Sequence, residues 1–183
     1  KRRTPRSTQS RSSAASDVYK RQVVKYIGGF MSRRLAREFA IQFLYSTDFN
    51  RNENTDEMLE DFYEIKKEQG KDGQQDSMKE ADMKFAEEII KGTIGKLQEI
   101  DQFIQNNTTG WTKERIAKVD LAILRLALYE ILFRDDIPDS VSINEAIELA
   151  KKYSTDESGS FVNGVLGKIK READIKVYGT NEQ

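Results

Sequence analysis

The hydrophobic pattern of the chain is most continuous over residues 119–133, which read VDLAILRLALYEILF. This stretch contains no Gly or Pro and is rich in Leu and Ala, so it predicts a helix. At about 100° per residue, its few polar side chains scatter around the helix and leave apolar side chains on nearly every side. These polar residues are Asp120, Arg125, Tyr129 and Glu130. The stretch is too short and too charged to span a membrane, so we predict a central core helix covered by other helices.

Five further helices are predicted from apolar residues at helical spacing. They are expected at residues 32–46, 55–68, 78–105, 142–153 and from 157 or 158 onward. The longest of them contains Gly92 and Gly95, each of which weakens a helix by up to about 1 kcal/mol relative to Ala, so we expect a bend or a close helix crossing there. Thr112 is the expected N-cap of the central helix, and Ser142 and Glu145 match a capping box. These six main helices predict an all-α fold.

The composition narrows the chemistry that the chain can perform. It has 183 residues, of which 33% are charged, and it contains neither Cys nor His. Disulfides, thiolate metal sites and cysteine nucleophiles are therefore excluded, and the commonest proton shuttle and metal ligand is absent. Any catalysis would have to use carboxylates, Lys, Ser, Thr or Tyr.

Charge is unevenly distributed along the chain. Residues 1–30 contain eight basic residues and one acidic residue, whereas residues 31–183 contain 22 basic and 30 acidic residues. Residues 12–22 (SSAASDVYKRQ) resemble a translated sequencing adapter, and Gly28, Gly29 and Phe30 before Met31 resemble a ribosome-binding site read as protein. We therefore expect residues 1–30 to be a non-native leader, with a disordered basic tail as the alternative, and residues 31–183 to form the domain.

The first predicted helix carries the clearest candidate binding surface. Arg34, Arg37, Ile41 and Tyr45 share one arc opposite its apolar face, and Arg33 lies at the boundary. Guanidinium groups suit phosphate oxygens, and an exposed Tyr can stack on an unpaired base. The alternative is a solvated face whose Tyr packs partly inward.

Four ordered blocks of sequence closely resemble the NusB family of bacterial transcription antitermination factors. They are residues 33–45 (RRLAREFAIQFLY), 119–125 (VDLAILR) with Ile137 and Pro138, 143–151 (INEAIELAK) and 161–166 (FVNGVL). Their order and spacing agree with the family from Met31 to about Lys170. The resemblance implies a fold of two side-by-side three-helix bundles, no catalytic activity, no cofactor and no metal site, and a cytoplasmic location.

The resemblance also implies a function. The family pairs with the ribosomal protein NusE and binds single-stranded boxA in nascent RNA, notably ribosomal RNA. The pair then helps to assemble an antitermination complex on RNA polymerase. A homodimer of the free protein is left open.

Two groups of residues match the family's binding surfaces. The RNA-binding group is Arg33, Arg34, Arg37, Gln42 and Tyr45, extended by Arg115, Lys118 and Tyr153. For the last three, packing or plain solvation is an equal alternative. The NusE-binding group is Glu114, Asp120, Glu157 and Phe161. Its alternatives are helix-start charge for Glu114 and Glu157 and core packing for Phe161.

Two other functions are considered. A NusB-like domain also forms the N-terminal part of some ribosomal RNA cytosine methyltransferases, but this chain has no Cys and no glycine-rich dinucleotide fingerprint. A protein-only interaction module with a merely solvated arginine face is the second alternative. Partner-enhanced, salt-dependent binding of boxA RNA separates the antitermination function from the second alternative.

Overall fold

The structure, a computed structural model, describes residues 33–49, 54–69, 80–108 and 115–178. Seven helices and no strands occur within these residues, which confirms the all-α prediction. The first helix spans residues 33–47. The others are α2 (Thr55–Gln69), α3 (Glu80–Gly95), α4 (Leu97–Asn107), α5 (Lys118–Phe133), α6 (Asp139–Tyr153) and α7 (Asp156–Tyr178). The predicted leader, residues 1–30, lies outside the described residues.

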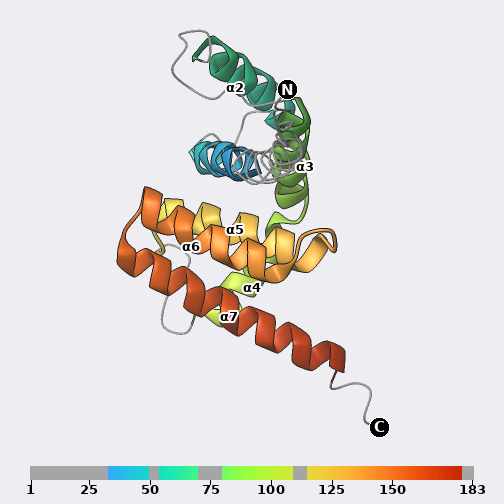
Figure 1. Ribbon diagram of the computed structural model, residues 1–183, viewed down its shortest axis with the longest axis vertical. Helices are drawn as coiled ribbons and strands as arrows, with labels where there is room; N and C mark the ends of the chain where they lie inside the picture. The colour runs from blue at the N-terminus through green and yellow to red at the C-terminus, as the bar shows by residue number, and fades with distance from the viewer. Residues whose placement is uncertain (1–32, 50–53, 70–79, 109–114, 179–183) are drawn as a thin grey trace, which may run out of the picture.

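The helices form two groups that lie side by side (Figure 1). The 33–47 helix, α2 and α3 make up the first group, whose core includes aromatic contacts of Phe39 and Phe43 with Phe62, at ring-centroid distances of 5.0 and 5.5 Å. The second group consists of α5, α6 and α7, with α4 packed against α5 and α7. This arrangement agrees with the predicted pair of three-helix bundles, to which α4 is added.

The central helix is α5, as predicted. Every residue from Leu121 to Leu128 is buried, and α5 contacts α3, α4, α6 and α7. Burial on all sides requires apolar side chains around the whole circumference, which is the pattern that the sequence provides. The helix begins at Lys118 rather than at Thr112, which lies outside the described residues.

The long predicted helix is broken into α3 and α4 at the expected glycines. Gly95 is the last residue of α3, and Lys96 separates the two helices. A Cβ atom at Gly92 would lie only 2.0 Å from the hydroxyl oxygen of Tyr129. The bend and the close helix crossing therefore both occur, at Gly95 and Gly92 respectively.

The predicted capping box of α6 is wrong. The helix begins three residues earlier, at Asp139, directly after Pro138. Ser142 and Glu145 therefore lie within the helix, where both are buried. Among the described helices, none is both long and apolar enough to cross a lipid bilayer.

Candidate nucleic-acid interface

The arginines near the start of the 33–47 helix have different environments. Arg33 is exposed, and its guanidinium lies 4.8 Å from the ring centroid of Phe85. The side chain of Arg34 is 31% exposed and lies 3.7 Å from the carboxylate of Glu38. Both arginines can therefore reach a ligand in solution, as the sequence predicts.

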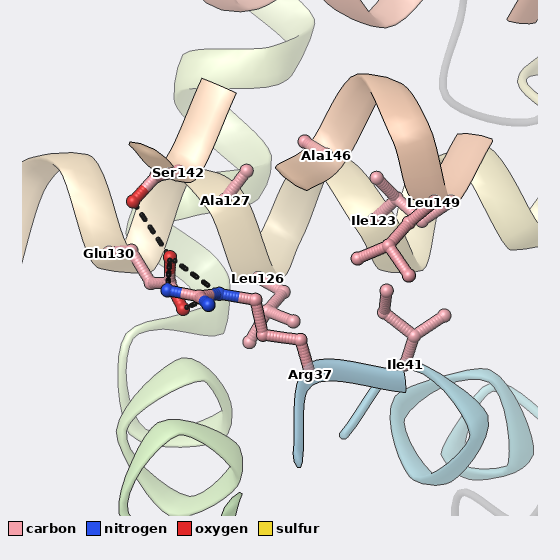
Figure 2. A pocket seen from close by; sticks show the side chains of 9 residues that line it. All are labelled: Arg37, Ile41, Ile123, Leu126, Ala127, Glu130, Ser142, Ala146 and Leu149. Atoms are coloured by element: carbon pink, nitrogen blue, oxygen red, sulfur yellow. Dashed lines mark hydrogen bonds and ion pairs between the residues drawn. The ribbon is translucent and has the colours of Figure 1, made fainter. Parts of the chain in front are cut away.

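Arg37 is buried, so the prediction that it faces solvent is wrong. Its Nε donates to the two carboxylate oxygens of Glu130 at 2.9 and 3.2 Å, and its Nη2 donates to Oε2 at 3.2 Å. Ser142 Oγ donates to the same carboxylate at 2.7 Å (Figure 2). The cavity at this junction holds only about 10 Å³, too little for a ligand.

The physical reason is that the second helix group covers this side of the 33–47 helix. Ile41, predicted on the same outward arc, is 2% exposed and packs with residues of α5 and α6 around the same junction (Figure 2). A direct RNA contact by Arg37 is therefore not supported. The ion pair instead joins the 33–47 helix to α5, and Ser142 extends the junction to α6.

An open pocket of about 130 Å³ lies next to this junction. Its lining residues are Ile41, Gln42, Tyr45, Val119 and Tyr153. The 33–47 helix supplies the first three, the start of α5 supplies Val119, and the end of α6 supplies Tyr153. Of the predicted RNA-binding residues, the structure thus brings Gln42, Tyr45 and Tyr153 together around one pocket with two aromatic walls.

Glu38 fixes the Tyr153 side of the pocket. Only 8% of this residue is exposed, and its carboxylate accepts hydrogen bonds from the Tyr153 hydroxyl at 2.9 Å and from Lys152 Nζ at 2.7 Å. Burial, followed by the hydrogen bond to Glu38, raises the pKa of Tyr153. The hydrogen bond to Glu38 is also the main reason that the pKa of Lys152 is raised, so the Lys152 ammonium stays charged beside the pocket.

Further cations lie near the start of α5. Lys118 Nζ is 3.8 Å from the carboxylate of Asp48, at the turn that follows the 33–47 helix. The same carboxylate accepts a 3.0 Å hydrogen bond from Arg125, a buried arginine that also binds Asp101. Arg115 is exposed just before α5. Lys118 directly precedes Val119, a lining residue of the pocket, in the sequence.

The predicted NusE-binding residues are only partly accessible. Asp120 is 5% exposed and accepts a 2.8 Å hydrogen bond from Ser158 Oγ, so it links the starts of α5 and α7 instead of presenting a free charge. Glu157 is exposed, and hydrogen bonds to its own backbone N–H and to Thr155 lower its pKa. Phe161 is partly buried against the core. Glu114 lies outside the described residues.

Comparison with known proteins decides the family. A sequence model of the NusB family matches residues 34–171. The chain belongs to the NusB family. A curated transcription antitermination protein NusB from Clostridium botulinum (strain Kyoto / Type A2) is 46% identical over 143 residues, which cover 76% of this chain and 99% of the relative.

Solved structures of the NusB family have the same fold. T. maritima NusB superposes with a TM-score of 0.65 at 36% identity and covers 76% of this chain and 91% of its own. A crystal structure of the antitermination factors NusB and NusE in complex with double-stranded RNA gives a TM-score of 0.64 at 27% identity and covers 78% and 98% of the two chains. These matches confirm the family resemblance and the fold that it implies.

In this NusB-family chain, sequence reasoning missed two residues that shape the surface. Glu38 lies beside predicted arginines but bonds to Tyr153 and Lys152, more than 100 positions away in the chain. Phe49 is 64% exposed next to Tyr45. A signal for Glu38 was present, since an acidic residue within a basic stretch requires a reason, whereas Phe49 follows the helix in a segment that reads as a polar turn.

Proposed function

We propose that this protein is a transcription antitermination factor that, together with NusE, binds boxA in nascent RNA. The complex then helps to assemble an antitermination complex on RNA polymerase, which sets its place of action in the bacterial cytoplasm. Family membership supports this function, and the solved complex of NusB and NusE with RNA is consistent with it. The observation that carries the proposal is the pocket lined by Tyr45 and Tyr153, with Lys152 Nζ 5.1 Å from the centroid of the Tyr153 ring.

The pocket suits an unpaired base better than a duplex. Aromatic rings offer stacking surfaces that a paired base cannot reach, and stacking contributes about 1–3 kcal/mol per base. Gln42 adds an amide that can donate to and accept from a base edge. In this proposal, phosphates of the strand are contacted by exposed or partly exposed cations around the pocket, namely Arg33, Arg34, Lys152, Lys118 and Arg115. Arg37 contributes indirectly, because it holds the pocket-bearing helix against α5.

A partner is required because the domain is acidic. Residues 31–183 carry 22 basic and 30 acidic residues, so a local cluster of cations gives weak and salt-sensitive binding by itself. In this proposal, Glu157 and Phe161 at the start of α7 contact NusE, and Glu114 adds a further acidic group. Asp120 supports that surface by holding Ser158. A basic partner would add phosphate contacts and cover acidic surface.

The test is the affinity for boxA RNA with and without NusE, from about 50 to 200 mM salt. NusE should raise the affinity, and salt should lower it. Tyr45→Ala should weaken RNA binding and leave NusE binding intact, whereas Phe161→Ala should do the reverse. Lys118→Ala should also weaken RNA binding. Its matched control is Lys96→Ala, because Lys96 packs over Phe133, which lies about 21 Å along α5 from Val119. The absence of any NusE-enhanced, salt-dependent affinity for boxA RNA would favour a protein-only interaction module.

A further inference from the structure

Tyr45 and Phe49 form an exposed aromatic pair. Among the described residues, they are the two large hydrophobic side chains that are exposed, at 39% and 64%. Isolated exposed hydrophobic residues are common on protein surfaces and need no explanation. These two, however, adjoin each other, with ring centroids 5.1 Å apart, and Tyr45 is also a wall of the pocket. The apolar surface therefore continues from the pocket to Phe49.

The turn that carries Phe49 is held in place by hydrogen bonds. The backbone N–H groups of Asp48 and Phe49 donate to the carbonyl oxygens of Tyr45 and Ser46 at 3.3 and 3.1 Å. The Asp48 side chain is 7% exposed and is anchored to Arg125 on α5. Because the preceding side chain is fixed inward, the ring of Phe49 is presented to solvent from an ordered turn. Because the turn is already ordered, the Phe49 side chain and its backbone lose little conformational entropy when a ligand binds.

An accessible cation lies near the turn that carries Phe49. Asp48, which directly precedes Phe49, is acidic, but its carboxylate is contacted by Arg125 at 3.0 Å and by Lys118 at 3.8 Å. The Lys118 side chain is 39% exposed, so its ammonium can also contact solvent or a phosphate. An exposed ring beside an accessible cation is the combination that binds single-stranded nucleic acid through stacking and backbone contact.

We propose that Phe49 is a second base-stacking position, which takes the nucleotide adjacent to the one in the pocket. This inference rests on the proposed RNA-binding function and extends its site along the strand. A base inserted between two rings needs roughly 7 Å, since each stacking contact takes about 3.5 Å. The rings of Tyr45 and Phe49 are too close for that and are inclined by 57°. The second base therefore covers the outward face of Phe49, and Lys118 contacts a neighbouring phosphate.

The experiment combines variants of Phe49 with an abasic scan of boxA RNA in the presence of NusE. Phe49→Leu retains an apolar side chain but removes the stacking surface, and it should weaken binding at least about fivefold. Phe49→Trp should restore wild-type affinity or exceed it. The loss caused by Phe49→Leu should vanish for the one RNA whose abasic position is the stacked nucleotide, because the two changes remove the same contact. Tyr45→Leu should couple in this way to the adjacent nucleotide.

The outcomes separate the inference from the function on which it rests. If wild-type protein with NusE does not bind boxA RNA, the proposed function and this inference both fail. If Tyr45→Leu weakens binding while Phe49→Leu leaves it unchanged, only the second stacking position is overturned. If Phe49→Leu weakens NusE binding in the absence of RNA, the ring belongs to a protein interface, and the inference is equally wrong. Thermal unfolding of Phe49→Leu should match wild type, because the ring is mostly exposed.

Discussion

Replacing Arg37 by Met should destabilise the fold without removing an RNA contact. The Arg37 side chain is 5% exposed and its partner carboxylate on Glu130 is 1% exposed. Met keeps the length of the aliphatic stem but removes the charge and three hydrogen bonds to the carboxylate. Glu130 is then left buried with the hydroxyl of Ser142 as its one remaining hydrogen-bond donor among the described residues.

The size of the loss follows from the burial of this charge. Removing one partner of a buried ion pair costs about 3–5 kcal/mol, because the remaining charge is neither solvated nor paired. A domain of this kind has a total stability of about 5–15 kcal/mol, so this loss is a large part of the whole. With a slope of about 2 kcal/mol per M, the urea midpoint should fall by roughly 1.5–2.5 M.

The assay is urea unfolding followed by circular dichroism, paired with RNA affinity measured where each variant is folded. The double variant Arg37→Met/Glu130→Leu is the control, since an apolar replacement of a buried ion pair is often neutral or stabilising. It should recover most of the lost stability, and both variants should bind RNA within about twofold of wild type. An unchanged urea midpoint together with a large loss of RNA affinity would refute the structural role of Arg37.

Two further predictions concern packing and pH. Gly92→Ala should lower the free energy of unfolding by about 1–3 kcal/mol despite the better helix propensity of Ala, because the new Cβ would clash with Tyr129. The control is Gly95→Ala, whose Cβ would have no neighbouring atom within 4 Å, and it should be neutral or stabilising. Thermal unfolding of both variants checks this prediction. Burial raises the pKa of Glu145 above its ordinary value of 4.5. Between these two pKa values, the folded state binds more protons than the unfolded state. The free energy of unfolding therefore falls as pH rises through this window. Glu145→Gln should therefore stabilise the protein at pH 7, and the difference in unfolding free energy between variant and wild type should shrink below about pH 4.5. A difference that does not change with pH would contradict the raised pKa of Glu145.

The core helix could be predicted from sequence because its pattern fits only one environment. A 16-residue helix with apolar side chains on all sides must be covered on all sides, and α5 is. The break between α3 and α4 was likewise predictable, because two glycines near the middle of a long periodic stretch mark a weak point. In both cases, the residue types that the local sequence pattern indicates are also the ones that the packing of the folded protein requires.

The environment of Arg37 could not be read from its own helix. Periodicity separates polar from apolar positions, but it does not separate a solvated charge from a buried one that is paired. The 33–47 helix is packed on two sides, by its own group and by α5 and α6, so its second face is also an interface. The available signal was Glu130, since a carboxylate within an almost wholly apolar helix requires a buried partner. The start of α6 was misplaced for a related reason: Ser142 and Glu145 match a capping motif but serve as buried side chains.

The same ion pairs that hold the two helix groups together also position the pocket. Gln42 and Tyr45 come from the 33–47 helix, Val119 from α5 and Tyr153 from α6, so the pocket exists only while three helices keep their relative places. Three polar links cross these boundaries: the Arg37 pair to Glu130, the Glu38 bonds to Tyr153 and Lys152, and the Asp48 contacts with Arg125 and Lys118. Ion pairs and hydrogen bonds fix direction and spacing more narrowly than apolar contact does, and a binding site gains affinity when its walls are fixed before the ligand arrives. The buried arginines of this chain therefore stabilise the packing of the helices that form the pocket, whereas the exposed arginines are accessible to solvent.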